Sequence, residues 1–286
     1  MCKGMRPVPE RDTSRSSGLL ATLLGILATF GTLLLVSGCS SNDTGTASDA
    51  PEETTEATTN ATFSLSYVAI GDSLAVGVGA DKGYVARYAD LIEADTGARV
   101  NLTNRGKSGE TSSELLYALR NDSSLRQTLS TADVITFNIG INDLGHAGEA
   151  YENGTCGGAD DQNCLRAAVE TFKENWDAVI TELLSLRSSS DTAIRTAGLG
   201  YTPYDYTDEA PGTRPSNGNL DDSRIFKPYV NEANSHIATT AASNDIPYVE
   251  VYLNKEDISG DGVHPNDEGY RVIADRLREL GYSPLR

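Results

Sequence analysis

Strand-like and helix-like segments alternate from about Phe63 to the end of the chain, and this alternation limits the possible folds most strongly. We expect short strands in residues 66–70, 99–103, 134–139, 193–198 and 248–252. We expect helices in residues 84–94, 112–120, 165–186, 224–242 and 267–280. Parallel strands need long crossover connections, usually helices, and these cover both faces of the sheet. The sequence therefore predicts one α/β domain over residues 63–286 with a five-stranded parallel sheet.

Polar segments follow four of the expected strands. They are Gly71-Asp72-Ser73-Leu74, Gly106 to Gly109, Gly140-Ile141-Asn142-Asp143 and Asp261-Gly262-Val263-His264. The C-terminal ends of parallel strands meet at one edge of the sheet, and ligands bind beyond that edge. Turn residues without a shared role would be spread over both edges, so the grouping indicates a functional site.

Ser73 is the candidate nucleophile in this group. A serine hydroxyl is weakly nucleophilic and needs a base to take its proton and a third group to orient that base. Of the three histidines, His264 follows Asp261 by three residues, and in a turn this spacing lets the carboxylate reach the imidazole. His236 lies in a helical stretch and is expected to be an ordinary helix residue. His146 follows the third strand, where it either lines the rim of a pocket or has no role.

Acyl transfer also needs hydrogen-bond donors for the oxyanion. The Gly109 backbone N–H, the Asn142 amide and the N–H of Ser73 itself are the candidates at this edge. Asp72 is expected to brace the turn through local hydrogen bonds, and a second acidic role in the chemistry is the alternative.

The polar segments, extended to Asn104-Arg105-Gly106-Lys107-Ser108-Gly109-Glu110-Thr111 and to Pro265, resemble the blocks of the SGNH (GDSL-type) hydrolase family. They occur in the family's order and span nearly the whole globular part. The resemblance implies a flavodoxin-like three-layer α/β/α sandwich. It also implies a serine esterase that hydrolyses carboxylic esters of lipids or acylated glycans through an acyl-enzyme. No cofactor is expected, and no His-rich or paired-carboxylate spacing in the sequence supports a catalytic metal.

The resemblance assigns roles to individual residues. It implies Ser73 as nucleophile, His264 as base and Asp261 as the partner of that base. It implies an oxyanion hole made of Ser73 N–H, Gly109 N–H and the Asn142 amide. Gly109 is preferred to Gly106 because Ser-Gly-Glu-Thr is more similar to the family's second block, which leaves Gly106 as a turn residue.

The first forty residues differ from the rest in their distribution of charged and apolar residues. A basic start is followed by a long apolar run, and this run leads to Val36-Ser37-Gly38-Cys39. These features are typical of a secretory signal, although the run is also long enough for a retained transmembrane anchor. Val-Ser-Gly-Cys resembles the bacterial lipobox, so we interpret residues 1–38 as a lipoprotein signal peptide and Cys39 as the lipidated residue. Residues 39–62, rich in Ser, Thr and Glu, are then a disordered tether that joins the lipid to the domain. The domain is expected to lie outside the cytoplasm, at the surface of a membrane.

Cys156 and Cys164 remain after the signal peptide and Cys39 are set aside. In an oxidising compartment they are expected to form a disulfide that closes a small polar loop. A metal site is the weaker alternative because no histidine lies nearby to complete a ligand set.

The net charge of −18 argues against a nucleic-acid partner, because phosphate binding needs a basic surface. Substrate choice is expected to depend on two connections at the catalytic edge, residues 144–163 and the Tyr201–Tyr206 loop. The alternative for the second is a proline-stiffened surface loop without a role in binding. Two alternatives remain open. One is a lipid-tethered module that binds glycan or lipid without catalysis, and the other is an acyltransferase on the same fold.

Overall fold

The computed structural model describes residues 63–199 and 223–285. The expected signal peptide, Cys39, the tether of residues 39–62 and the Tyr201–Tyr206 loop lie outside the described residues. Within the described ranges, no helix is both long enough and apolar enough to span a bilayer.

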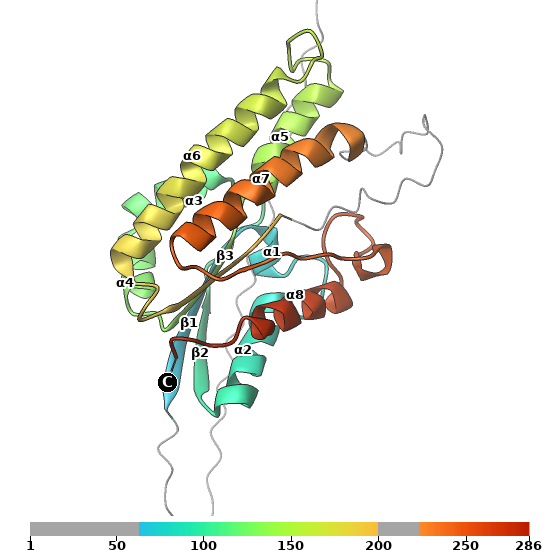
Figure 1. The fold of residues 1–286 in the computed structure, drawn as a ribbon. Coiled ribbons are helices and arrows are strands. Elements are labelled where there is room, and N and C mark those ends of the chain that lie inside the picture. Colours follow the sequence, from blue (N-terminus) through green and yellow to red (C-terminus); the bar gives the residue numbers. More distant parts are fainter. Residues whose placement is uncertain (1–62, 200–222, 286) are drawn as a thin grey trace, which may run out of the picture. The chain divides into compact units, whose positions relative to one another are not determined.

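A five-stranded sheet forms the centre of the domain, and all its neighbouring strands are parallel (Figure 1). The strands are β1 (Ser64–Gly71), β2 (Arg99–Asn104), β3 (Val134–Asn138), β4 (Ala193–Ala197) and β5 (Tyr248–Val249). Their order across the sheet is β2-β1-β3-β4-β5. From β1 the chain first adds β2 on one side, and it then crosses to the other side of β1 to add β3, β4 and β5 in turn. The switch point therefore lies between the neighbouring strands β1 and β3. This is the flavodoxin-like order, in which ligands bind at that switch point. Each expected strand is present, but the last is only two residues long.

Eight α-helices and a short 3₁₀ helix are present in the described residues. They are α1 (Ser73–Val76), α2 (Tyr84–Thr96), α3 (Ser112–Asn121), α4 (Ser123–Ser130), α5 (Ile141–Glu152), α6 (Asn163–Leu186), α7 (Ser223–Ser243), η2 (Lys255–Asp257) and α8 (Asp267–Glu279). The sequence did not predict α1, α4 or α5. α1 is a single turn, α4 buries only two apolar residues, and α5 contains Gly145 and Gly148, which are poor helix formers.

The helices form two layers, one on each face of the sheet. Helices α3 to α7 pack on one face, and α1, α2 and α8 pack on the other (Figure 1). The predicted three-layer α/β/α sandwich is confirmed.

β1 is buried on both faces, and this explains why its sequence contains a continuous apolar run. Val68 and Ile70 pack with the helices of the larger layer, whereas Tyr67 and Ala69 pack with those of the smaller layer. All four side chains are fully buried, so successive residues serve opposite cores.

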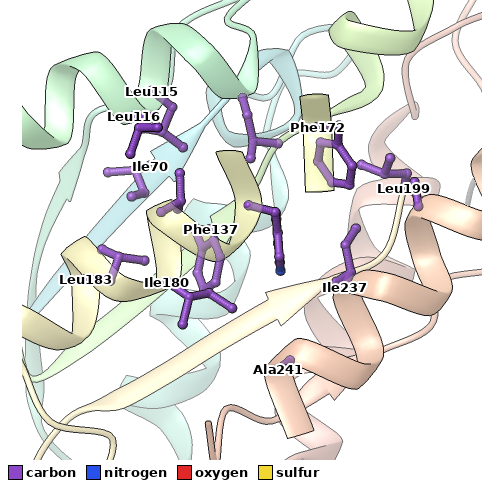
Figure 2. Close-up of a cluster of buried hydrophobic side chains, with 14 of the residues drawn as sticks. Ile70, Leu115, Leu116, Phe137, Phe172, Ile180, Leu183, Leu199, Ile237 and Ala241 are labelled. Carbon is purple, nitrogen blue, oxygen red and sulfur yellow. The ribbon is translucent and has the colours of Figure 1, made fainter. Parts of the chain in front are cut away.

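The larger core contains Phe137 from β3 and Ile180 from α6, near Ile237 of α7 (Figure 2). Trp176 of α6 stacks on Phe137 with the ring centroids 5.1 Å apart. Residues of α6 and α7 thus share one apolar core with the strands, and the aromatic stack joins α6 to β3.

Candidate active site

Hydrogen bonds join the four polar segments at the C-terminal edge of the sheet. The Lys107 N–H donates to the Gly71 carbonyl at 2.8 Å, which ties the second segment to the first. The Asn142 amide donates to the Glu110 carbonyl at 2.9 Å, which ties the third segment to the second. His264 contacts Ser73, which ties the fourth segment to the first.

Ser73 is the first residue of α1, and Asp72 alone separates it from the end of β1. Asp72 is the N-cap residue, and its Oδ1 accepts the Leu74 N–H at 3.0 Å. Gly71 takes φ +131°, and a Cβ there would lie 2.1 Å from the Asn138 carbonyl oxygen. The sharp turn that presents Ser73 therefore requires glycine at position 71. The expectation that Asp72 braces this turn agrees with its hydrogen bond.

Ser73, His264 and Asp261 form one line of hydrogen bonds. The Nε2 atom of His264 lies 2.8 Å from Ser73 Oγ, and the Nδ1 atom lies 2.7 Å from Asp261 Oδ2. Ser73 is buried, and the His264 side chain is 20% exposed. A base is thus in contact with the hydroxyl, and a carboxylate is in contact with the far side of the base.

The loop around Asp261 holds its carboxylate in the ionised form. Its Oδ1 accepts the N–H groups of Val263 and His264 at 2.9 Å each and the Ser259 hydroxyl at 2.7 Å. Burial alone would raise the pKa of Asp261, but these hydrogen bonds and the one to His264 outweigh it and hold the pKa well below its usual range. Sequence reasoning missed Ser259, which carries no motif of its own.

The connection between α1 and α2 holds the His264 loop in place. Tyr270 of α8 donates its hydroxyl to the Val78 carbonyl at 2.7 Å. Gly79 takes φ +95°, and a Cβ there would lie 2.9 Å from His264 Cβ. Sequence reasoning missed this contact, although three closely spaced glycines at 77, 79 and 83 mark a connection that approaches other chain segments closely.

Three hydrogen-bond donors lie on these same segments. Ser73 is the first residue of a helix, so its N–H has no acceptor inside that helix. Gly109 takes φ +78°, and the space beside its Cα is open. Asn142 donates one amide hydrogen to Glu110 and keeps a second. Gly106, in contrast, packs closely against Ala75 of α1.

Three carboxyl groups lie together on these segments. Asp72 is fully buried and Glu110 nearly so, and within the described structure Asp72 Oδ2 and Glu110 Oε2 have no hydrogen-bond partner. Burial raises the pKa of Asp72, Glu110 and Asp143. For Asp72 the pKa reaches about 7, with the charges of Glu110 and Asp143 adding to the effect of burial.

The other two histidines lie apart from this line of hydrogen bonds. His236 of α7 contacts Asp177 of α6 at 2.7 Å, as an ordinary helix residue would. His146 is exposed on α5. The predicted disulfide between Cys156 and Cys164 is present, and it joins the loop after α5 to the first turn of α6.

A groove of about 660 Å³ opens beside Gly109. Residues 107–110 line it together with one face of α3, where Ser113, Tyr117 and Asn121 follow one another at four-residue spacing. Tyr117 is 70% exposed.

Comparison with protein families identifies one matching family model. The GDSL-like lipase/acylhydrolase model matches residues 69–272, which include all four polar segments.

Two relatives share the sequence over most of their length. The spore germination lipase LipC of Bacillus licheniformis is 29% identical over 233 residues, covering 78% of this chain and 99% of LipC. The YpmR protein of Bacillus subtilis (strain 168) is 28% identical over 264 residues, covering 86% of this chain and 91% of YpmR.

Solved structures share the fold. The lipase Lip_vut3 from a goat rumen metagenome is 27% identical, with a TM-score of 0.65 over 78% of this chain and all of that one. A variant of Axe2, an acetyl xylan esterase from Geobacillus stearothermophilus, has a TM-score of 0.52 at 19% identity, over 78% of this chain and 98% of that one.

Proposed function

The chain belongs to the GDSL-like lipase/acylhydrolase family and is an ester hydrolase, and on that premise we propose that it cleaves carboxylic esters with Ser73, His264 and Asp261. The observation that carries the proposal is the line of hydrogen bonds from Ser73 through His264 to Asp261, with distances of 2.8 and 2.7 Å. A base in contact with a serine hydroxyl, itself oriented by a carboxylate, is the arrangement that nucleophilic acyl transfer needs.

The reaction begins when His264 Nε2 takes the proton of Ser73 as Ser73 Oγ attacks the ester carbonyl carbon. The tetrahedral intermediate collapses, and the alcohol leaves with the proton that His264 returns. Water then attacks the acyl-enzyme by the same route, with His264 as base. Asp261 stays ionised because its pKa is lowered by its hydrogen bonds, and it stabilises the positive charge that His264 carries in each transition state.

The oxyanion is held by Ser73 N–H, Gly109 N–H and the second amide hydrogen of Asn142. Two features support this part of the proposal. The hydrogen bond to Glu110 fixes the plane of the Asn142 amide, and the open side of Gly109 leaves room for a ligand.

We assign the non-reacting part of the ester to the groove beside Gly109, because this groove adjoins a proposed oxyanion donor. The substrate is a lipid ester or an acylated-glycan ester. Two relatives, LipC and Lip_vut3, are named as lipases, which supports the first of these classes.

The domain acts outside the cytoplasm in this proposal, held at a membrane by lipid on Cys39 through residues 39–62 after removal of residues 1–38. The disulfide between Cys156 and Cys164 supports an oxidising compartment.

The test is an assay of the chain and its Ser73→Ala variant on p-nitrophenyl esters with acyl groups from acetyl to long chains. We expect the wild-type chain to hydrolyse them and the variant to lose nearly all turnover while its circular dichroism spectrum is unchanged. The acyl-length profile then separates a small-acyl esterase from a lipase. Equal hydrolysis by both proteins would show that Ser73 is not the nucleophile.

A further inference from the structure

Asp143 directly follows Asn142 in the first turn of α5, and its carboxylate binds the start of another helix. Its Oδ2 accepts the backbone N–H of Ser112, the first residue of α3, at 2.9 Å, and its Oδ1 accepts the Ser112 hydroxyl. The mechanism proposed above gives Asp143 no task.

This carboxylate lies where two helices begin. Ser112 N–H is one of the N–H groups that α3 cannot satisfy internally, so Asp143 supplies a partner for it from α5. Negative charge is favoured near both helix N-termini, because each carries a partial positive charge. Asn175 of α6 donates to the Ser112 hydroxyl at 3.0 Å, so Ser112 is held from both sides.

Asn142 and Asp143 together attach α5 to one short stretch of chain. Asn142 donates to the Glu110 carbonyl, and Asp143 accepts from Ser112 two residues later. Gly109 directly precedes that stretch. Two of the three proposed oxyanion donors thus lie on segments that these hydrogen bonds join directly.

We propose that Asp143 is a positioning residue that holds the Asn142 amide and the Gly109 N–H at the separation one oxyanion requires. This inference rests on the proposed function, because it concerns donors that act only in ester cleavage. Donors stabilise an oxyanion when they lie about 2.7–3.1 Å from it, so loss of the Asp143 link weakens them without removing them.

Asp143→Ala is expected to lower kcat for p-nitrophenyl acetate by about 10- to 100-fold, part of the loss that follows removal of a whole donor. KM is expected to change little, because the donors act on charge that develops in the transition state. Asp143→Asn keeps an acceptor for the Ser112 N–H, and its kcat is expected to lie much closer to that of the wild-type chain than to that of Asp143→Ala.

A double-mutant cycle separates positioning from general stability. Residues that act as a unit have non-additive effects, so Asp143→Ala is expected to cost a much smaller factor in an Asn142→Ala background than in the wild-type chain. Equal factors in the two backgrounds, or an unchanged kcat in folded Asp143→Ala, would overturn the inference. If Asp143→Ala does not fold, Ser112→Ala, which removes the hydroxyl that donates to Asp143 Oδ1, is measured in both backgrounds and judged by the same comparison.

Asp133 supplies the matched control. Its Oδ2 accepts the Ser66 N–H of β1 at 2.8 Å, so it also links two elements through a backbone N–H, but just before β3, at the opposite edge of the sheet. Asp133→Ala is expected to lower the melting temperature and leave kcat unchanged. A kcat loss equal to that of Asp143→Ala would also overturn the inference. Ser73→Ala, assayed in parallel, distinguishes a failure of the proposed nucleophile from a failure of this inference.

Discussion

The Asp72 carboxyl group lies beside the proposed nucleophile and is closed off from solvent. One oxygen caps α1, and the other has no hydrogen-bond partner among the described residues. A buried carboxylate without a full set of partners is costly, so the folded protein favours the protonated form. The pKa of about 7 in the folded state, against 3.8 for the free side chain, expresses that preference.

The shift predicts how stability depends on pH. Because the folded pKa lies above the unfolded value, the folded state binds more protons than the unfolded state between about pH 4 and pH 7. The contribution of Asp72 is therefore most favourable below that window. It becomes less favourable as the pH rises through it, by about 1.4 kcal/mol for each unit of the pKa difference.

Asp72→Asn removes this titration while the amide oxygen can still cap α1. We expect the variant to gain thermal stability over the wild-type chain at pH 8 and to gain much less at pH 5. Melting temperatures of both proteins at the two pH values measure the difference. A gain of equal size at both would show that the charge on Asp72 is not the cause.

The turn between β1 and α1 depends on one glycine. Gly71 has positive φ, and a Cβ there would meet the backbone of β3 at 2.1 Å, so no side-chain movement relieves the contact. Gly97, just after α2, also has positive φ, but a Cβ added there would have no atom within 4 Å. The two residues share the backbone requirement and differ in the space around them.

Gly71→Ala and Gly97→Ala therefore form a matched pair. We expect Gly97→Ala to cost about 1–2 kcal/mol of unfolding free energy, the cost of a left-handed conformation in an L-residue. Gly71→Ala is expected to cost much more, or to prevent folding, because β1 and β3 have to separate. Urea unfolding measures both. Similar losses would mean that the sheet adapts easily at this edge.

The elements that could be predicted are those whose sequence pattern follows burial. β1 and β3 are buried on both faces, so each appears as an apolar run, and α6 buries seven residues at helical spacing. α5 could not be predicted because its glycines lower helix propensity, and its position depends on packing against α6 and α7 instead.

The contacts in the candidate site also fall into two groups, those that sequence spacing predicts and those that it does not. Asp261 and His264 are three residues apart, so their contact is local and the spacing predicts it. The Ser112 to Asp143 link joins residues 31 positions apart, and the Gly79 contact with His264 joins residues still farther apart in sequence. Neither leaves a pattern in the sequence, because both depend on how the loops at the sheet edge pack together.

At the scale of the whole molecule, the sheet brings distant segments to one edge. Ser73 and His264 are 191 positions apart, and they meet because β1 lies near the centre of the sheet and the segment after β5 returns to that edge. The groove beside Gly109 extends from this edge along one face of α3. The α3 face of the groove carries none of the three residues proposed for the hydrogen-bonded line, Ser73, His264 and Asp261, whereas Gly109 belongs both to the groove and to the proposed oxyanion donors. Side chains on α3 can therefore change without altering the proposed reacting groups.

Tyr117 tests this separation of binding from chemistry. Tyr117 is 70% exposed and lines the groove, and an exposed aromatic ring offers apolar contact area to a bound substrate. We expect Tyr117→Ala to raise KM several-fold for esters with a long acyl chain or a sugar alcohol and to leave kcat/KM for p-nitrophenyl acetate unchanged, because an acetyl group offers almost no apolar area for contact with the ring.

Tyr117→Phe keeps the ring and is expected to behave like the wild-type chain if contact area is what matters. Phe63, 45% exposed just before β1 and so at the opposite edge of the sheet, provides the control Phe63→Ala, which should leave KM unchanged for every ester. A uniform loss for small and large esters in Tyr117→Ala would mean that the ring supports the reacting groups instead of the substrate. An unchanged KM for all large esters would place the non-reacting part of the ester elsewhere along the edge.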